Sequence, residues 1–187
     1  MLVAGSALVE IAAAQTRPDF TGTWVLDAQR SSVSGGGRGD PTAGGRRTGP
    51  GGGQGGGTGL GVPPERLTIR QDANTITIDQ DFVDRTVTVT YRLDGKPAAN
   101  TLPMGRDRVV PNAMYSSGWR DARLRTIIRA TIVGPGGSRE VEFEERRYLD
   151  REGRMIVETT SRSGGGGRRT VYNRGTAEPG THRTASE

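Results

Sequence analysis

The sequence predicts an all-β domain, an antiparallel up-and-down meander of eight or nine strands that closes into a lipocalin-like barrel. Three observations carry this prediction. Apolar and polar residues alternate with a period of two along much of the chain, β-branched residues are common in the alternating stretches, and short turn sequences separate them. No stretch shows the periodicity of a helix. Closure into a barrel is expected because it removes the exposed edges of a long meander.

The first expected strand runs from Phe20 to Trp24, and the others follow a glycine-rich segment. The alternating stretches are 67–70, 75–79, 86–93, 123–132, 140–144, 155–162 and 168–174. Turn sequences such as Asp94-Gly95 connect them. Residues 97–117 are less regular, with apolar residues among Pro, Gly and Asn, and are expected to form an irregular strand or a flap over an opening.

Three segments are expected to add little to the folded domain, which spans 19–174. Residues 1–14 are small and apolar and end in three alanines, like a truncated or mis-started signal peptide; the alternative is an alanine-rich helix. Residues 34–61 are nearly all Gly, Arg, Pro, Thr and Ser, which predicts a disordered loop because there is little to bury. Residues 175–187 form a polar tail. The signal peptide predicts a periplasmic or secreted protein.

The basic composition does not by itself indicate a nucleic-acid partner. The chain carries a formal charge of +5 and a pI of about 10.3. Lys96 is the only lysine among 26 basic residues, which indicates a codon bias toward arginine, and the arginines are not gathered in one stripe. We therefore expect no nucleic-acid binding. No stretch is long and apolar enough to be a transmembrane helix.

The residue types needed for common active sites are missing from the expected domain. The chain has no cysteine, and its only histidine, His182, lies in the polar tail. The usual nucleophile–base pairs and zinc sites therefore cannot be assembled. Asp79, Asp81 and Asp84 gather near a strand end, where Asp79 and Asp81 could bind Ca²⁺ or serve as the acid/base pair of an enzyme. Their spacing matches no calcium loop, so we interpret them as solvated outer-face acids. We predict no enzyme activity, no catalytic residue, no metal and no cofactor.

Two rows of opposite charge are expected to lie side by side on adjacent strands. Glu140, Glu142 and Glu144 form the acidic row, and Arg123, Arg125 and Arg129 form the basic row on the preceding strand. Cross-strand ion pairs of this kind set the register of a sheet. We predict a structural role for both rows.

The first strand resembles the opening strand of lipocalin-type barrels. Gly22-Thr23-Trp24 is similar to their GxW signature, and the resemblance implies that Trp24 plugs one barrel end beneath an arginine from the last strand. Arg174 is the nearest match, and Arg168 and Arg169 compete with it. Gly22, Trp24 and Arg174 are therefore expected to close the barrel. Avidin-like barrels begin in a similar way, but their biotin sites use several tryptophans and this chain has two.

More of the chain resembles a group of uncharacterised exported bacterial proteins with lipocalin-like folds. Their mature forms begin Asp-Phe-(Thr/Ser)-Gly-Thr-Trp, which matches Asp19–Trp24 here. Also similar are Tyr91–Lys96, Trp119–Leu124 and Thr170–Arg174, so that the resemblance covers 19–174 apart from the glycine-rich segment. The group implies no established activity.

The favoured functional hypothesis is a binding module that holds a small apolar or amphipathic ligand inside the barrel. The expected lining residues are Ile78, Phe82, Val89 and Tyr91, with Met104, Met114, Tyr115 and Trp119 near the mouth. The alternative is a structural or interaction protein of the cell envelope. In that hypothesis the same residues fill a solid barrel, and 34–61 contacts an envelope polymer or another protein.

Overall fold

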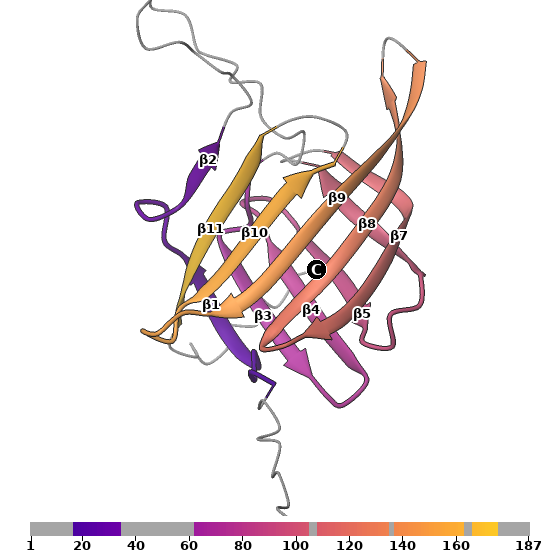
Figure 1. Cartoon of the computed structure of the whole chain (residues 1–187). Helices are drawn as coiled ribbons and strands as arrows, with labels where there is room; N and C mark the ends of the chain where they lie inside the picture. The colour runs from indigo at the N-terminus through magenta and orange to yellow at the C-terminus, as the bar shows by residue number, and fades with distance from the viewer. Residues whose placement is uncertain (1–16, 35–61, 105–107, 135–136, 163–165, 176–187) are drawn as a thin grey trace, which may run out of the picture.

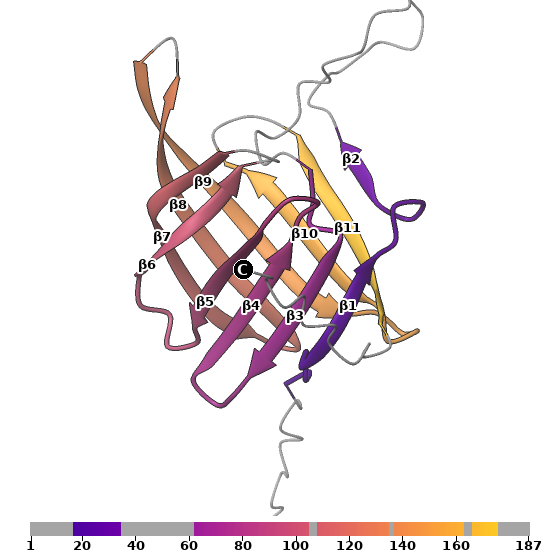
Figure 2. The same ribbon diagram turned by 180° about the vertical axis from the view of Figure 1, so that it is seen from behind.

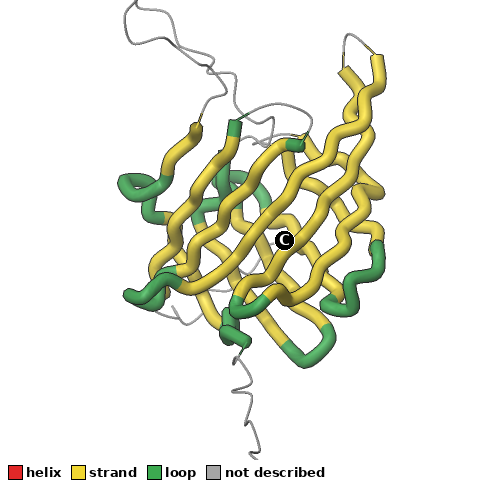
Figure 3. Tube along the Cα trace, in the orientation of Figure 1, coloured by secondary structure: helices red, strands yellow, loops and turns green. Residues whose placement is uncertain are grey.

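A computed structural model of the chain describes residues 17–34, 62–104, 108–134, 137–162 and 166–175. These residues form strands, turns and loops, with no helix among them (Figure 3). The strands are β1 (Gly22–Leu26), β2 (Ser32–Ser34), β3 (Arg66–Gln71), β4 (Thr75–Asp81), β5 (Thr86–Arg92), β6 (Ala98–Met104), β7 (Arg108–Arg120), β8 (Arg123–Gly134), β9 (Gly137–Leu149), β10 (Met155–Ser161) and β11 (Gly167–Arg174). The all-β prediction is confirmed.

The predicted signal peptide, glycine-rich loop and polar tail lie almost wholly outside the described residues. Within the described ranges, no helix has the length and hydropathy needed to cross a bilayer.

The strands form one antiparallel sheet that curls into a nearly closed barrel (Figures 1 and 2). Along the sheet the order is β5-β4-β3-β1-β11-β10-β9-β8-β7-β6, and β2 pairs with β11 beyond the end of β1. In Figure 1 the strands β4, β6, β8 and β10 end at the top, which we call the upper end of the barrel. The strands β3, β5, β7, β9 and β11 end at the bottom, the lower end.

The barrel closes between β5 and β6 through a side chain, because no described backbone ladder joins these two strands. The side-chain amide of Asn100 in β6 accepts a hydrogen bond from the Thr90 backbone N–H (3.0 Å) and donates one to the Thr90 carbonyl (2.8 Å). An amide side chain offers the same donor and acceptor as a peptide group. Asn100 therefore substitutes for one pair of ladder hydrogen bonds.

Alternation along the strands separates an apolar inner face from a charged outer face. In β8, Leu124, Thr126 and Ile128 point inward and are buried, as predicted. On the outer face the Nε of Arg129 lies 2.7 Å from a Glu142 carboxylate oxygen, and the Nε of Arg125 lies 2.8 Å from Glu144. Two cross-strand ion pairs between the predicted rows are therefore present, whereas Arg123 lies over the Tyr148 ring, with its guanidinium carbon 4.6 Å from the ring centroid.

Glu144 is the centre of these ion pairs. It is buried although it faces outward, and it contacts Arg125, Arg146 and Arg162. The hydrogen bond from Arg125 and those from the other two arginines lower the pKa of Glu144 from 4.5 to about 2, against the opposing effect of burial. Arg162 also contacts Glu142 at 3.0 Å, close to the last described pairing of β10 with β9 at Ser161.

The irregular stretch 97–117 forms parts of two wall strands, β6 and β7, and not a flap. β7 pairs with β8 only from Met114 toward the lower end. Asn112 has a positive φ of 57°, and Pro111 has no backbone N–H to donate, so neither suits a continued ladder. Beyond this point β8 and β9 continue as a two-stranded arm that projects past the upper end of the barrel (Figure 1).

Candidate functional site

The lower end of the barrel is sealed by aromatic side chains. Trp24 is fully buried, and its indole N–H donates to the Phe20 carbonyl at 2.8 Å. The Phe20 ring in turn stacks on Trp119, with ring centroids 5.8 Å apart. Three rings from the N-terminal segment, β1 and β7 thus close the floor. We call Phe20, Trp24, Trp119 and Arg174 the seal.

Arg174 covers the seal, and Gly22 makes room for it. The guanidinium carbon lies 4.6 Å from the Trp24 ring centroid, and the side chain donates to the carbonyls of Thr21 (3.0 Å) and Asp19 (3.3 Å). Gly22 has a φ of +123°, and a Cβ there would lie 3.2 Å from Nη1 of Arg174. Glycine at the first position of Gly22-Thr23-Trp24 therefore has a steric and a conformational reason.

Four of the predicted lining residues point into the barrel: Ile78, Val89, Tyr91 and Tyr115 are buried on the inner face. Phe82 and Met104 are half-buried and lie at the upper end, where β4 and β6 stop. The guanidinium carbon of Arg85 lies over the Phe82 ring, 5.5 Å from the ring centroid. The structure therefore brings four predicted residues into the interior and places two at its upper end.

The remaining two predicted positions need correction. Met114 is 39% exposed on the outer face, because strand alternation turns it outward when its neighbour Tyr115 points inward. Trp119 does point inward, but it belongs to the seal and not to the mouth. The reason is direction: β7 runs from the upper end to the lower end, so its last residues lie at the floor.

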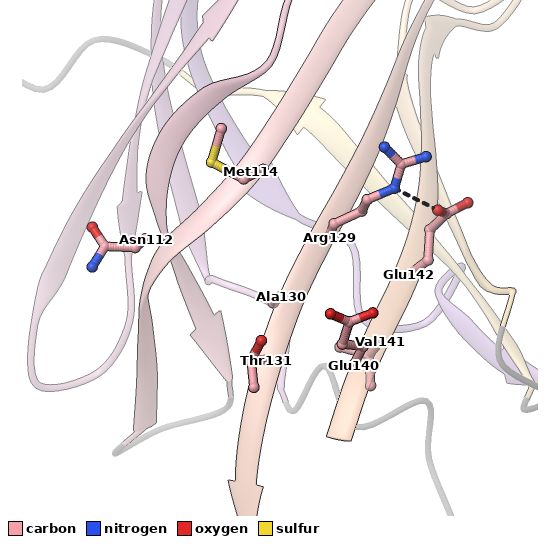
Figure 4. Close-up of a pocket in the computed structure, with 8 residues that line it drawn as sticks. All are labelled: Asn112, Met114, Arg129, Ala130, Thr131, Glu140, Val141 and Glu142. Carbon is pink, nitrogen blue, oxygen red and sulfur yellow. Dashed lines mark hydrogen bonds and ion pairs between the residues drawn. The ribbon is translucent and has the colours of Figure 1, made fainter. Parts of the chain in front are cut away.

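A groove lined by the predicted residue Met114 lies on the outside of the wall. It has a volume of about 470 Å³ and occupies the place where β7 parts from β8 (Figure 4). Its lining residues are Asn112, Met114, Arg129, Ala130, Thr131, Glu140, Val141 and Glu142. The Arg129–Glu142 ion pair crosses its wall. This groove is open to solvent and belongs to the base of the arm, not to the barrel interior.

The interior contains a charged pair that the sequence prediction missed. Arg147 in β9 points inward and is 3% exposed, and its Nη2 lies 2.9 Å from the carboxylate of Glu145. Its guanidinium carbon lies 5.5 Å from the Tyr91 ring centroid. The sequence signal was available, because the alternation that places Val141 and Phe143 inside also places Glu145 and Arg147 inside.

Arg147 has donors that the described protein does not satisfy. Within the described residues, its buried Nε and Nη1 have no hydrogen-bond partner. Burial acts to lower the pKa of Arg147, but Glu145 and the neighbouring tyrosines outweigh it, so the pKa lies above its usual value. A permanently charged guanidinium therefore presents unpaired N–H groups to the barrel interior.

Three buried tyrosines, Tyr91, Tyr115 and Tyr172, lie around the Arg147 guanidinium. Tyr91 and Tyr115 meet edge to face, with centroids 5.6 Å apart, and the Tyr172 hydroxyl donates to the Pro64 carbonyl at 3.3 Å. Burial, helped by the negative charge of Glu145, raises the pKa of all three phenols. They remain protonated and neutral at physiological pH, so they add no negative charge to the interior.

Inward-facing side chains are less completely buried toward the upper end of the barrel. Inward-facing apolar residues there keep 6–9% of their surface exposed: these are Val87, Val110, Ala130, Ile132 and Val141. Residues near the seal, such as Trp24 and Met155, are fully buried. Most of the inward-facing apolar residues that keep some exposure therefore lie toward the upper end, although Val157, beside Arg147 in the lower half, keeps 7%.

The acidic group predicted at a strand end lies outside the barrel. Asp79 forms an ion pair with Arg70 at 2.8 Å and accepts from the Thr88 hydroxyl at 2.7 Å. Burial opposes ionisation, but these hydrogen bonds lower the pKa of Asp79. Asp81 accepts from Thr86 at 2.7 Å. In the part of the chain that the structure describes, no group of acidic or histidine side chains is arranged to hold a metal ion.

Comparisons with known proteins give little beyond the shape of the chain. No protein-family model matches the sequence. No curated protein matches it either. Among solved structures, a similar one is named a REP1-NXSQ fatty acid transporter, with a TM-score of 0.48 and 11% sequence identity. The match covers 84% of this chain and 97% of that one. A likeness at this level carries no argument about ligands.

Proposed function

We propose that this protein is a non-enzymatic binding protein that holds a small amphipathic molecule inside its barrel. One observation carries the proposal: the barrel is sealed by aromatic rings at one end, while its inner face at the other end is reached by solvent. Barrels of about eight strands are already wide enough for packed side chains or one small ligand, and diameter grows with strand number. A mainly apolar lining with few convergent polar groups is typical of such sites.

A neutral fluorescent probe tests the proposal. N-phenyl-1-naphthylamine carries no charge, so its fluorescence increase on titration reports apolar binding alone. We expect saturable binding with one site per chain. In Ala130→Trp an inward-facing position near the upper end receives a bulky ring, and we expect at least a tenfold loss of affinity.

The neighbouring residue provides the matched control. Thr131 is exposed and points outward, so Thr131→Trp should bind the probe like the unmodified protein. Ala130→Leu is a milder filling variant if the tryptophan variant does not fold. Absence of saturable binding, or equal losses in Ala130→Trp and Thr131→Trp, would contradict the proposal. That result would favour the alternative of a solid barrel with a structural or interaction role in the cell envelope.

Export to the periplasm or out of the cell is a further part of the proposal, supported by the alanine-rich sequence of residues 1–14. A role of residues 34–61 in contacting an envelope polymer or a protein is likewise proposed from their Gly/Arg composition. Cell fractionation with and without residues 1–14 tests the first. Deletion of residues 35–61 tests the second, with loss of envelope association as the expected result while the probe still binds.

A further inference from the structure

We infer that the ligand is an anionic amphiphile whose oxyanion group binds at Arg147, deep inside the barrel. This inference rests on the proposed function and adds the chemical class of the ligand. It follows from the hydrogen-bond donors, the charge balance and the direction of the strand that carries Arg147.

The first argument is the unpaired donors of Arg147. A buried polar group without a partner is destabilising, more so when it is charged, so folded proteins rarely leave one. Arg147 uses Nη2 for Glu145, while its buried Nε and Nη1 have no partner among the described residues. An acceptor oxygen from a ligand would satisfy them. A guanidinium forms its strongest hydrogen bonds with carboxylate and phosphate oxygens.

The second argument is the charge of the interior above the seal. Two guanidinium groups, Arg147 and Arg168, face inward from β9 and β11, and one carboxylate, Glu145, faces them. The three nearby phenols are neutral because burial raises their pKa values. These three charged groups together therefore carry one net positive charge. Charges interact more strongly in such a buried place than in water, which favours an anion.

The third argument is the position of the apolar residues relative to Arg147. β9 runs from the upper end toward the lower end, so Phe143 and Val141 lie above Arg147 on the same inner face. At about 3.3 Å per residue, the distance along the strand from Val141 to Arg147 is about 20 Å. A molecule with its charged group at Arg147 would place an alkyl chain against Phe143, Val141 and Ile132. Its far end would reach the more exposed upper end.

Competition against the neutral probe tests the headgroup. Dodecanoate, dodecyl phosphate and dodecanol share an alkyl chain and differ in the group at its end. We expect at least one of the two anions to displace the probe at a concentration at least tenfold lower than dodecanol. The two anionic arms distinguish a carboxylate ligand from a phosphate ligand. Equal displacement by all three compounds would overturn the inference while leaving the proposed function intact.

Substitutions at Arg147 locate the site. Arg147→Gln should remove the tenfold preference for the anion while dodecanol still competes, and Arg147→Lys should restore part of it. Arg146→Gln is the matched control, because Arg146 is the next residue and points outward. Since Arg147→Gln leaves Glu145 without its partner, the double variant Glu145→Gln/Arg147→Gln is measured as well. Retention of the anion preference in both Arg147→Gln variants, or its equal loss in Arg146→Gln, would overturn the inference.

Discussion

The two ends of this barrel are built from different kinds of side chain. The lower end buries Phe20 and Trp24 completely, and Arg174 lies across Trp24. The upper end instead presents valines to solvent, with Val83 69% and Val133 68% exposed. The strand walls connect these ends with a mainly apolar inner face that also carries Arg147, Arg168 and Glu145. Complete burial at one end and solvent exposure at the other are thus separated along the barrel axis, so changes at each end should have different consequences.

The sharpest test of this difference is the seal itself. Trp24→Ala removes a fully buried indole and its hydrogen bond to Phe20, and we expect it to lower the free energy of unfolding by about 3–5 kcal/mol. Urea denaturation measures the change. Val25→Ala is the matched control on the outer side of the same strand, where a change below about 0.5 kcal/mol is expected. Similar losses in both variants would show that the seal is not the centre of stability.

The second test concerns the base of the arm at the upper end. Glu144→Gln removes the carboxylate that three arginines share, and we expect a loss of about 1–3 kcal/mol at pH 7. Because the pKa of Glu144 is about 2 when folded and 4.5 otherwise, its stabilising effect is complete above about pH 4.5. It disappears as the pH falls toward 2.

Urea denaturation at pH 7 and at pH 2.5 separates this effect from simple loss of packing. The difference between Glu144→Gln and the unmodified protein should shrink at the lower pH. Glu140→Gln serves as the control, since Glu140 is exposed on the arm itself. A loss that is independent of pH would contradict the assignment of the effect to the carboxylate charge.

The third test concerns closure of the wall between the two ends. Asn100→Ala removes both hydrogen bonds to the Thr90 backbone, so we expect a loss of about 1–2 kcal/mol and faster hydrogen exchange at the Thr90 amide. Asn74→Ala in the exposed β3–β4 turn is the control, with a change below about 0.5 kcal/mol. An unchanged exchange rate at Thr90 would mean that other contacts hold β5 against β6.

The smallest effect is expected at the upper end. Val83 lies in the exposed connection between β4 and β5, so Val83→Ser should change the free energy of unfolding by less than about 0.5 kcal/mol. The buried Val89 in the next strand provides the contrast, because Val89→Ser should cost several times more. A loss above 1 kcal/mol for Val83→Ser would show that this side chain has a packing partner and that the two ends differ less than proposed.

The sequence allowed the wall of the barrel to be predicted well, because alternation with a period of two is a local property. Alternation over 123–132 predicts Leu124, Thr126 and Ile128 on one face and Arg125 on the other, and the structure buries the first three inside the barrel. The same rule, continued past Phe143, would have placed Glu145 and Arg147 inside. A charged residue on an inner face is easily passed over, since burial of a charge is costly unless it has a partner. The partner of Arg147 is Glu145, two residues before it in the same strand. Their ion pair depends on the orientation of both side chains, which the structure shows.

Other parts of the candidate site depended on the direction and pairing of strands. Alternation alone could not show that the irregular stretch holds two strands, β6 and β7, so the end of the barrel at which Trp119 lies was misjudged. It also could not show that β7 separates from β8 at Pro111 and Asn112, which leaves Met114 beside an outer groove. These features depend on which strands meet, and that is a long-range property.

Local sequence patterns were enough to predict the all-β class, the face on which most wall residues lie, and a structural role for Gly22 in Gly22-Thr23-Trp24. Each depends on the geometry of a few neighbouring residues, such as the alternation of a strand. The folded barrel was needed to show that Arg174 covers Trp24 and that Asn100 joins β5 to β6. It was also needed to show that Arg147 lies beside Tyr91 with donors that no described residue pairs. Each of these contacts joins different strands of the barrel, and curling of the sheet brings these strands together.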